Sequence, residues 1–332
     1  MDAKLKVMVI GSNSFSGSDF VDLLLEGKKY SVLGVSRSPE KSALFLPYKR
    51  HVSPDFEFKQ IDLNKDMPAL KGLLAAFRPD YVVNFAAQSE VAPSWGDPAQ
   101  WFRTNAVALT ELADFLKDCK FLKTYVHISS PEVYGACVGT VKEDAPLNPS
   151  TPYAASKAAG DLSLFTFVKN FRFPLVMIRS TNVYGAHQQL FKIIPRSVIY
   201  AKSGRTIELH GGGEAVKSFI HIRDISKGEL AAMERGRHGE LYHLSPDQGI
   251  AVKDVVRIIC ERMNVDFGKA ARAAAERLGQ DKAYVIDSSK ARKEFGWKPE
   301  LSMEEGLAGV VSWIEKNWAA IEKEPLEYIH KD

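Results

Sequence analysis

The strongest indication of the fold lies in the stretch KVMVIGSNSFSG, residues 6–17. Its apolar first half predicts a buried strand, and its second half is a turn that opens a helical pattern. Gly11 and Gly17 stand at the ends of this turn, and Ser14 occupies the middle position that a dinucleotide-binding loop usually gives to a further glycine. The residues fit either such a loop with one substitution or a serine-rich helix cap.

The place of this turn in the chain favours the dinucleotide loop. The turn follows the first predicted strand directly and begins the first predicted helix, where the phosphate-binding turn of an α/β protein lies. Gly11 would permit the tight turn, Gly17 would let the helix pack closely on the sheet, and N–H groups at the helix start would face a pyrophosphate. The predicted loop residues are Gly11, Ser14, Phe15, Ser16 and Gly17.

Short apolar runs alternate with helical patterns through the first half of the chain. This alternation predicts a parallel sheet covered on both faces, so the expected fold class is α/β with a Rossmann-type doubly wound parallel sheet. The expected strands are 6–11, 31–38, 56–64, 80–87, 124–130 and 174–180. The expected helices are 16–27, 66–77, 101–119 and 153–171.

The character of the chain changes near residue 182, after which turns and scattered basic residues become frequent. We therefore predict an NAD(P)-binding domain over residues 1–181 and a smaller C-terminal substrate-binding domain over residues 182–332. A helix and a strand within about 218–246 look like a return to the sheet, so the two domains are expected to be interleaved along the chain.

The composition is that of an ordinary globular chain. Lys plus Arg number 44 and Asp plus Glu 41 among 332 residues, so the net charge is +3, and no dense basic run indicates nucleic-acid binding. No apolar run suggests a membrane span, and the first ten residues enter a strand pattern without signal-peptide features. Cys119, Cys137 and Cys260 lack metal-ligand spacing and cannot all pair, which favours a reduced, cytoplasmic setting without a metal.

The end of the second predicted strand bears on the choice of cofactor. A dinucleotide without a 2′-phosphate is usually held there by an acidic residue on the ribose hydroxyls, but this chain has Ser36, Arg37 and Ser38. A guanidinium between two hydroxyls suits a 2′-phosphate better than a carboxylate would. The sequence therefore favours NADP, with NAD as the second choice; the alternative is an arginine in a solvated loop.

The stretch PYAASKAAGD places Tyr153 and Lys157 four residues apart, on one face of a predicted helix. An ammonium near a phenol favours the phenolate and so lowers the pKa of the tyrosine. Such a tyrosine can take a proton from a sugar hydroxyl while hydride leaves the same carbon. An ordinary exposed pair would have the same spacing, but HISSPEVYG (residues 127–135) places polar residues at the ligand-binding edge of the sheet just before it.

These motifs together resemble the extended short-chain dehydrogenase/reductases, and within them the nucleotide-sugar epimerases and dehydratases. The resemblance covers nearly the whole chain and rests on GSNSFSG, NFAAQS, HISSPEVYG, YAASK, RSTNVYG, SFIHIRDI and DSSKARKEFGW. It implies that Tyr153 and Lys157 form the catalytic pair and that Ser130 binds the reacting sugar oxygen. It also implies a tightly bound dinucleotide, with further contacts from Asp62 and Leu63 to adenine, from Ala86, Ala87 and Gln88 beside the cofactor, and from Asn105 in the central helix.

The same resemblance narrows the reaction to a nucleotide-sugar 4,6-dehydratase, acting in surface-glycan or deoxysugar biosynthesis. In those enzymes the stretch that matches SSPEVYG carries a hydroxyl and a glutamate, and here Ser130 and Glu132 fit. Glu132 would remove the C5 proton, whereas the dTDP-glucose enzymes carry an aspartate where Pro131 stands, so the C6 acid is left unassigned. A UDP-glucuronate decarboxylase, a C4 or C5 epimerase and a 5,6-dehydratase remain alternatives, and a non-catalytic dinucleotide sensor is disfavoured because both Tyr153 and Lys157 are present.

The expected substrate is a nucleoside-diphosphate sugar. The resemblance places Asn182 at its diphosphate, and Lys217 stands where related enzymes often have an arginine that grips the same group. A lysine lacks the bidentate fork of arginine, so Lys192 or Arg196 could supply a second cation, although each could be a surface charge. Two further candidates on the substrate side are Ser89 and Ser94.

The resemblance also implies at least a homodimer, in which the helix that begins near Tyr153 and the helix that holds Asn105 pack against the same pair in a second subunit. Leu162, Phe165 and Phe167 are available for such a face, although they could equally belong to the core of one chain.

Overall fold

The computed structural model describes residues 4–136, 139–275 and 285–330. Its centre is a seven-stranded sheet with the order β12-β7-β5-β4-β1-β2-β3, in which every neighbouring pair is parallel. The strands are β1 (Leu5–Ile10), β2 (Tyr30–Ser36), β3 (Phe56–Gln60), β4 (Tyr81–Asn84), β5 (Thr124–Ile128), β7 (Leu175–Ser180) and β12 (Glu240–Leu244). The strand order reverses between β1 and β4, and an open sheet of this kind forms its ligand crevice at the carboxyl ends of such a pair.

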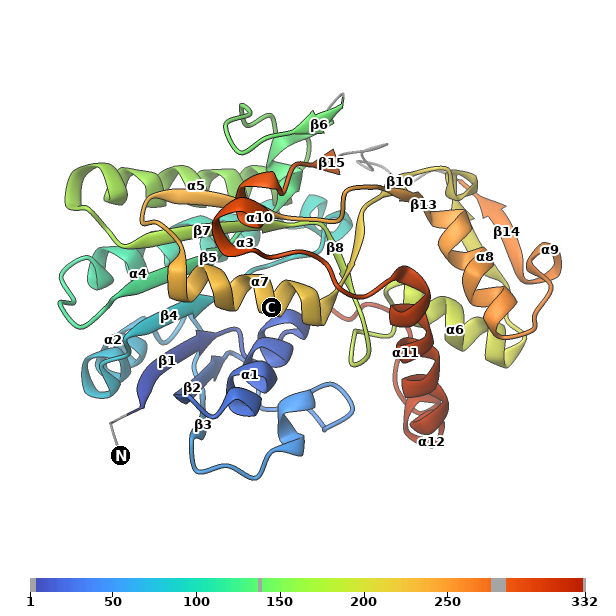
Figure 1. Cartoon of the computed structure of the whole chain (residues 1–332), viewed down its shortest axis with the longest axis horizontal. Helices are drawn as coiled ribbons and strands as arrows, with labels where there is room; N and C mark the ends of the chain where they lie inside the picture. Colours follow the sequence, from blue (N-terminus) through green and yellow to red (C-terminus); the bar gives the residue numbers. More distant parts are fainter. Residues whose placement is uncertain (1–3, 137–138, 276–284, 331–332) are drawn as a thin grey trace.

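Helices cover both faces of the sheet (Figure 1), as the sequence predicts for a doubly wound α/β fold. Successive residues of β1 divide between two cores, with Val7 and Val9 in one and Met8 and Ile10 in the other. The first core lies under α1 (Phe15–Gly27), α7 (Ile222–Arg235) and α10 (Ser289–Phe295). The second core lies under α2 (Met67–Phe77), α4 (Leu109–Leu116) and α5 (Pro152–Phe171).

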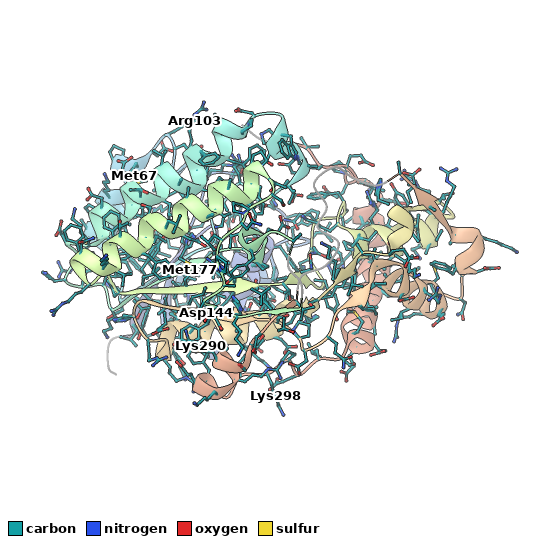
Figure 2. All side chains as sticks on the ribbon, turned by 90° about the horizontal axis from the view of Figure 1, so that it is seen from above. Met67, Arg103, Asp144, Met177, Lys290 and Lys298 are labelled. Carbon is teal, nitrogen blue, oxygen red and sulfur yellow. The ribbon has the colours of Figure 1, made fainter. Side chains whose placement is uncertain are left out.

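The helix predicted over residues 101–119 is continuous, but its hydrogen-bond pattern changes along its length. The structure divides it into α3 (Pro98–Phe102), a π-helical segment η3 (Arg103–Ala108) and α4. Seen from above, the η3–α4 helix and α5 run side by side over the sheet, and Arg103 points away from the body of the molecule (Figure 2). A Cβ on Gly160 of α5 would lie 2.2 Å from the carbonyl oxygen of Asn105, so α5 touches the backbone of η3 directly.

A second lobe lies beside the carboxyl edge of the sheet and appears at the right of Figure 1. Its helices are α6 (Ile193–Ser203), α8 (Val252–Arg262), α9 (Phe267–Ala270), α11 (Met303–Lys316) and α12 (Trp318–Ile321). Its strand pairs are parallel β9 (Ile207–His210) with β14 (Ala271–Ala274) and antiparallel β10 (Val216–Lys217) with β13 (Ile250–Ala251). These elements enclose apolar cores of their own, although β12 and α7 belong to the main sheet and its cover.

Short elements complete the connections. Two further parallel pairs are β8 (Asn182–Tyr184) with β11 (Phe219–His221) and β6 (Thr140–Val141) with β15 (Val285–Ile286). The short helices are η1 (Pro47–Arg50), η2 (Ala92–Trp95), η4 (Pro131–Tyr134) and η5 (Gly211–Gly213). Within the described ranges, no helix is both long and apolar enough to cross a membrane.

Candidate active site

The turn after β1 requires glycine at two positions. Gly11 has a φ of +87°, and a Cβ there would lie 2.7 Å from the backbone nitrogen of Ala86. A Cβ on Gly17 would lie 2.3 Å from the Gly11 carbonyl oxygen. Ser14, between them, is the N-cap of α1, and its Oγ accepts a hydrogen bond from the Gly17 N–H at 3.0 Å. The two glycines thus allow close backbone contacts in the loop, and Ser14 caps the helix that follows.

A cavity of about 280 Å³ lies beside this turn, at the carboxyl ends of β1 to β4. It is the crevice expected at the point where the strand order reverses, and the small residues that floor it leave room for a dinucleotide backbone. The predicted cofactor and substrate residues that line it are Gly11, Ser14, Ser36, Arg37, Asp62, Leu63, Ala86, Ala87, Gln88 and Ser89. The predicted residues Phe15, Ser16 and Gly17 form the first turn of α1 next to the cavity.

The loop after β2 presents cations to this cavity. Arg37 lines it together with Lys41, a residue that the sequence reading did not single out. The acid of the same loop, Glu40, accepts a hydrogen bond from the Tyr48 hydroxyl at 2.9 Å and is absent from the cavity wall. The hydroxyl of Ser36 accepts a hydrogen bond from the Asn13 N–H at 2.9 Å, which fixes the loop against the glycine turn.

Asn105 stabilises one wall of the cavity through hydrogen bonds to the lining residue Gln88. Its side-chain amide exchanges two hydrogen bonds with the backbone of Gln88, both of 2.9 Å. Its Nδ2 also donates to the Ser156 Oγ at 3.0 Å. Because Asn105 is buried and lies in η3, it joins the loop after β4 to α5 one residue before Lys157. Asn105 therefore supports the cofactor loop through Gln88.

The first turn of α5 is fixed from two sides. Thr151 is its N-cap and accepts a hydrogen bond from the Ala154 N–H at 3.1 Å. The Tyr153 N–H donates to the Ser94 Oγ at 3.2 Å, and the same hydroxyl donates to the Val91 carbonyl at 2.6 Å. Ser94, predicted on the substrate side, is thus buried and holds the start of α5 in place.

Tyr153 is buried near the end of β5. Burial raises the pKa of its phenol, the charge of Glu132 raises it further, and a hydrogen bond with Ser130 acts in the opposite direction. The expectation that the Lys157 ammonium lowers this pKa is not met in the protein alone, because desolvation of the phenolate exceeds the favourable contacts. The structure nevertheless brings the predicted residues Ser130, Glu132 and Tyr153 together.

Lys157 lies one helical turn beyond Tyr153, and its ammonium contacts two residues of β5. Its Nζ donates to the Ile128 carbonyl at 2.8 Å and lies 3.4 Å from the His127 Nε2. Burial lowers the pKa of Lys157 to about 8, which Asp161 opposes. Burial and the charge of Lys157 lower the pKa of His127 to about 4, so the imidazole is neutral at pH 7.

Behind Lys157 lies a buried ionic group that the sequence reading missed. Asp161, one turn further along α5, accepts hydrogen bonds from the Ser129 hydroxyl at 2.6 Å and from the Arg179 guanidinium at 2.7 Å. Burial alone would raise the pKa of Asp161, but the neighbouring His127 and Arg179 lower it to about 2. A signal for this group was available, because His127 and Arg179 stand inside strands that the sequence predicts to be buried on both faces.

Glu132 and Pro131 lie in η4, directly after Ser130. The Ser130 Oγ caps this short helix by accepting a hydrogen bond from the Glu132 N–H at 3.3 Å. Pro131 is buried in its first turn and has no side-chain donor. Glu132 is half-buried, and its charge acts on Tyr153.

The remaining predicted substrate residues come from the second lobe. Asn182 lies in β8, and its buried Nδ2 has no hydrogen-bond partner within the described residues. Lys192 pairs with Glu90 at 2.7 Å, across the opening between the two lobes. Arg196 lies in α6 and Lys217 in β10. An unpaired buried amide is expensive, so the Asn182 side chain is the one among these that is poised for a polar ligand.

The thiols and acids that the structure describes offer no metal site. No group of three or more His, Cys, Asp or Glu in residues 4–136, 139–275 and 285–330 is arranged to hold a metal ion. Cys119 and Cys260 are free thiols, and Cys137 lies outside the described residues.

Comparisons with known proteins agree with this geometry. A family model described as GDP-mannose 4,6 dehydratase matches residues 8–310. A dTDP-glucose 4,6-dehydratase from Streptomyces antibioticus is 29% identical over 97% of this chain and 96% of its own length. The solved structure of a dTDP-glucose 4,6-dehydratase from Streptomyces venezuelae with NAD and TYD bound superposes with a TM-score of 0.89, is 30% identical, and covers 97% of this chain and 100% of its own.

Two further relatives differ from these dehydratases, one in its activity and the other in its length. A UDP-glucuronic acid 4-epimerase from Bacillus cereus, solved with UDP-glucuronic acid and NAD, is 25% identical with a TM-score of 0.86, over 94% of this chain and 99% of its own. The chain spans about half, 47%, of a trifunctional UDP-glucose 4,6-dehydratase from Arabidopsis thaliana that is 27% identical over 94% of this chain.

Fold, cleft and comparisons together define an extended short-chain dehydrogenase/reductase that uses a nicotinamide dinucleotide. The chain belongs to the GDP-mannose 4,6-dehydratase family, whose model matches most of its length. The prediction of an NAD(P)-dependent enzyme of the nucleotide-sugar dehydratase and epimerase group is thereby confirmed.

Proposed function

We propose that this protein is a nucleotide-sugar 4,6-dehydratase, which converts an NDP-hexose to an NDP-4-keto-6-deoxyhexose without net oxidation. The observation that carries the proposal is the meeting of Ser130, Glu132 and Tyr153 at the end of β5 and the start of α5. A 4-epimerase needs the tyrosine and the hydroxyl, whereas an elimination also needs a base such as Glu132 near the sugar.

The cavity fits the dinucleotide in chemistry as well as place. Gly11 and Gly17 let the turn pack directly on its neighbouring backbone, and Gly11 and Ser14 line the cavity at the start of α1, where a helix N-terminus favours a pyrophosphate. The chemistry that a bound dinucleotide supplies there is hydride storage, taken from C4 of the sugar and returned to C6.

Tyr153 acts on the C4 hydroxyl, and Ser130 holds the same oxygen by a hydrogen bond. Tyr153 acts in its phenolate form, whose oxygen receives the hydroxyl proton as C4 becomes a ketone. Lys157 carries positive charge one helical turn away, and its ammonium is held by the Ile128 carbonyl. The neutral His127 and the ionised Asp161 behind it keep that ammonium in position.

Glu132 acts at C5 and C6. Once C4 is a ketone the C5 proton is acidic, and the carboxylate removes it. Because Pro131 offers no donor, the same carboxyl group then gives the proton to the C6 hydroxyl as the C6–O bond breaks, so that one water leaves. After hydride reaches C6, C5 takes up a proton from solvent. Tyr153 then releases the proton that it took from the C4 hydroxyl to water.

The decisive experiment is incubation with a panel of nucleotide sugars, followed by mass spectrometry of the products. Loss of one water identifies the 4,6-dehydratase, and a retained 4-keto-6-deoxy sugar separates it from a 5,6-dehydratase. Loss of carbon dioxide would identify a decarboxylase, and an unchanged mass with altered configuration would identify an epimerase.

The role of Glu132 is tested by Glu132→Gln. An amide cannot accept the C5 proton, so the reaction should stall after oxidation of C4, and near-ultraviolet absorbance of reduced dinucleotide should accumulate. Incorporation of solvent deuterium at C5 should fall sharply. The matched control is Glu111→Gln, an exposed carboxylate on α4, which should behave like the wild type. Unchanged deuterium incorporation in Glu132→Gln would place the base elsewhere.

For the cofactor we propose NADP. Arg37 and Lys41 place two cations beside the Ser36 and Ser38 hydroxyls at the cavity wall, and Glu40 is turned to Tyr48. Arg37→Ala should therefore weaken binding of NADP more than that of NAD, measured by titration calorimetry. Two relatives have been solved with NAD, which makes NAD the competing choice. Recovery of NAD from the native protein would overturn this proposal.

For the substrate we propose that Asn182 and Lys217 face the diphosphate of the nucleotide sugar, with Arg196 as a further cation. The unpartnered Nδ2 of Asn182 supports this, because a phosphate oxygen would satisfy it. Lys192 is paired with Glu90 at the mouth of the cavity, so its contribution is expected to be smaller.

For assembly we propose a homodimer through the η3–α4 and α5 helices. Val107 is 63% exposed and Leu162 is 59% exposed on these neighbouring helices (Figure 2), whereas Phe165 and Phe167 pack into the core of the chain. Light scattering at micromolar concentration should report a dimer, and Leu162→Glu should dissociate it. A monomeric wild-type protein would contradict the proposal.

A further inference from the structure

The segment from Leu326 to His330 crosses the opening of the dinucleotide cavity. After α12 the chain turns back toward the sheet (Figure 1), and Tyr328 and Ile329 line the same cavity as the glycine turn. No known role of the sugar chemistry requires residues from this part of the chain, and nothing in the sequence pattern of the segment pointed to the cavity.

The segment is anchored in both lobes. Leu326 packs against the apolar core of the second lobe, and the Tyr328 ring meets Phe191 edge to face with 5.3 Å between ring centroids. At the other end, the His330 ring stacks on Trp101 of α3 at 5.3 Å and 7°. The His330 Nε2 also lies 2.6 Å from the Gln100 Oε1. The segment therefore bridges the lobes over the cavity.

Tyr328 lies at the middle of this bridge, between the two sides of the cavity. Burial raises the pKa of the Tyr328 phenol, and the charge of Glu90, which follows β4, raises it further. The charge of Arg37, which follows β2, lowers this pKa, so the ring is near both residues. Its hydroxyl lies 2.9 Å from the His330 Nδ1 and connects the lining residue to the anchor on Trp101. The Glu90–Lys192 ion pair crosses the same opening beside it.

We propose that residues 326–330 form the outer wall of the dinucleotide site, with Tyr328 as a cofactor-contacting residue, and that the detachment of His330 from α3 sets the rate of dinucleotide release. A dinucleotide seated on the glycine turn lies inside this wall and cannot leave until the wall opens. An enzyme that returns its hydride within one cycle needs no such opening during turnover. The proposal rests on the dinucleotide site of the family and is independent of the sugar chemistry proposed above.

The test measures release of NADP and NAD from the full-length protein, by rapid mixing with an excess of competing dinucleotide and no sugar present. Tyr328→Ala and His330→Ala should each raise the release rate by about tenfold, which corresponds to one well-packed contact. Tyr328→Phe keeps the ring but loses the hydrogen bond to His330, so its release rate should lie between those of the wild type and Tyr328→Ala. The matched control is Glu327→Ala, because Glu327 is exposed in the same segment and does not line the cavity.

Thermal unfolding of each variant without dinucleotide separates a wall from a merely structural contact. An unchanged melting temperature with faster release supports the proposal. A rise in release rate of less than about threefold in both alanine variants would overturn it. Tighter binding in those variants would also overturn it, because the segment would then compete with the dinucleotide rather than enclose it. Because no sugar is present, neither result depends on which reaction the enzyme catalyses.

Discussion

Asp161 and Glu229 are carboxylates buried on opposite faces of the same sheet, the first on α5 and the second on α7. Asp161 accepts hydrogen bonds from Ser129 and Arg179. Glu229 has no hydrogen-bond partner on either oxygen among the residues that the structure describes. The charge that acts on it is that of another acid, Asp19.

The two groups ionise in opposite directions for one physical reason. Burial disfavours the charged form of both. A hydrogen bond with His127 and the charge of Arg179 overcome this for Asp161 and lower its pKa to about 2, whereas burial and Asp19 raise the pKa of Glu229 well above its usual value. The α5 side therefore holds a fixed charge behind the active site, whereas burial on the α7 side favours the protonated form of Glu229, between α1 and α7. The partner, and not the burial, decides what a buried acid does.

The largest expected effect separates the two faces by turnover. Tyr153→Phe removes the oxygen that receives the C4 hydroxyl proton, so the rate should fall by about 10²–10⁴. Glu229→Gln on the other face should leave the rate close to that of the wild type, because α7 supplies nothing to the cleft. Both are measured as dehydration of the best substrate, with dinucleotide binding as the control. A Tyr153→Phe rate above about a tenth of the wild type would remove this tyrosine from the proton transfer.

The next effect is on stability at the α5 side. Asp161→Asn leaves the buried Arg179 guanidinium without its counter-charge, which should lower the free energy of unfolding by about 3–5 kcal/mol. Adding Arg179→Met should restore part of the loss, since no unpaired charge then remains. Urea denaturation of the two variants measures both values. Equal losses in the single and double variants would show that the pair is not what stabilises this face.

The α7 side should respond in the opposite direction. Glu229→Met replaces an unpaired buried carboxyl group by an apolar side chain of similar length, so the free energy of unfolding at pH 8 should rise by about 1–3 kcal/mol. Ile225→Ala, a cavity-forming change on the same helix, should lower it and serves as the control. A less stable Glu229→Met protein would mean that the carboxyl group has a partner in solution.

The smallest effect is the dependence of stability on pH. The folded protein keeps Glu229 protonated where the unfolded chain has already released that proton, near pH 4.5 and above. The unfolding free energy should therefore fall as the pH rises from about 4.5 toward the raised folded pKa, by at most about 1.4 kcal/mol per pH unit. Asp161 acts in the reverse sense, because its contribution is lost as the pH falls toward 2. Urea midpoints from pH 5 to 8 should show a shallower decline for Glu229→Gln than for the wild type.

The sequence predicted the parts of this molecule whose signals are local. The α/β fold follows from alternating patterns, and the glycine turn follows from Gly11 and Gly17 beside a strand. The spacing of Tyr153 and Lys157 predicted their common helix face, and the family model confirms the class of enzyme. The place of Ser36 and Arg37 on the cavity wall also agrees with the predicted end of the second strand.

The rest depended on contacts between distant parts of the chain. His127, Asp161 and Arg179 come from three elements, and their grouping follows only from the order of β5 and β7 in the sheet. The direction of the Tyr153 pKa shift depends on burial, which spacing cannot report. Tyr328 reaches a cavity whose lining comes mostly from the first ninety residues, and no sequence pattern near Tyr328 indicates this.

The π-helical segment η3 constrains how this chain can change its length. Its turn is wider than an α-helical one, so the segment accommodates a residue that a regular helix would not. Removing one residue between Arg103 and Ala108 would close this wide turn into a regular helix. The Asn105 side chain that meets Gln88 and the Asn105 carbonyl that Gly160 touches both belong to the wide turn, so its closure would disturb both contacts. A deletion here should be worse tolerated than any single replacement in the segment, so insertions and deletions among relatives should avoid it.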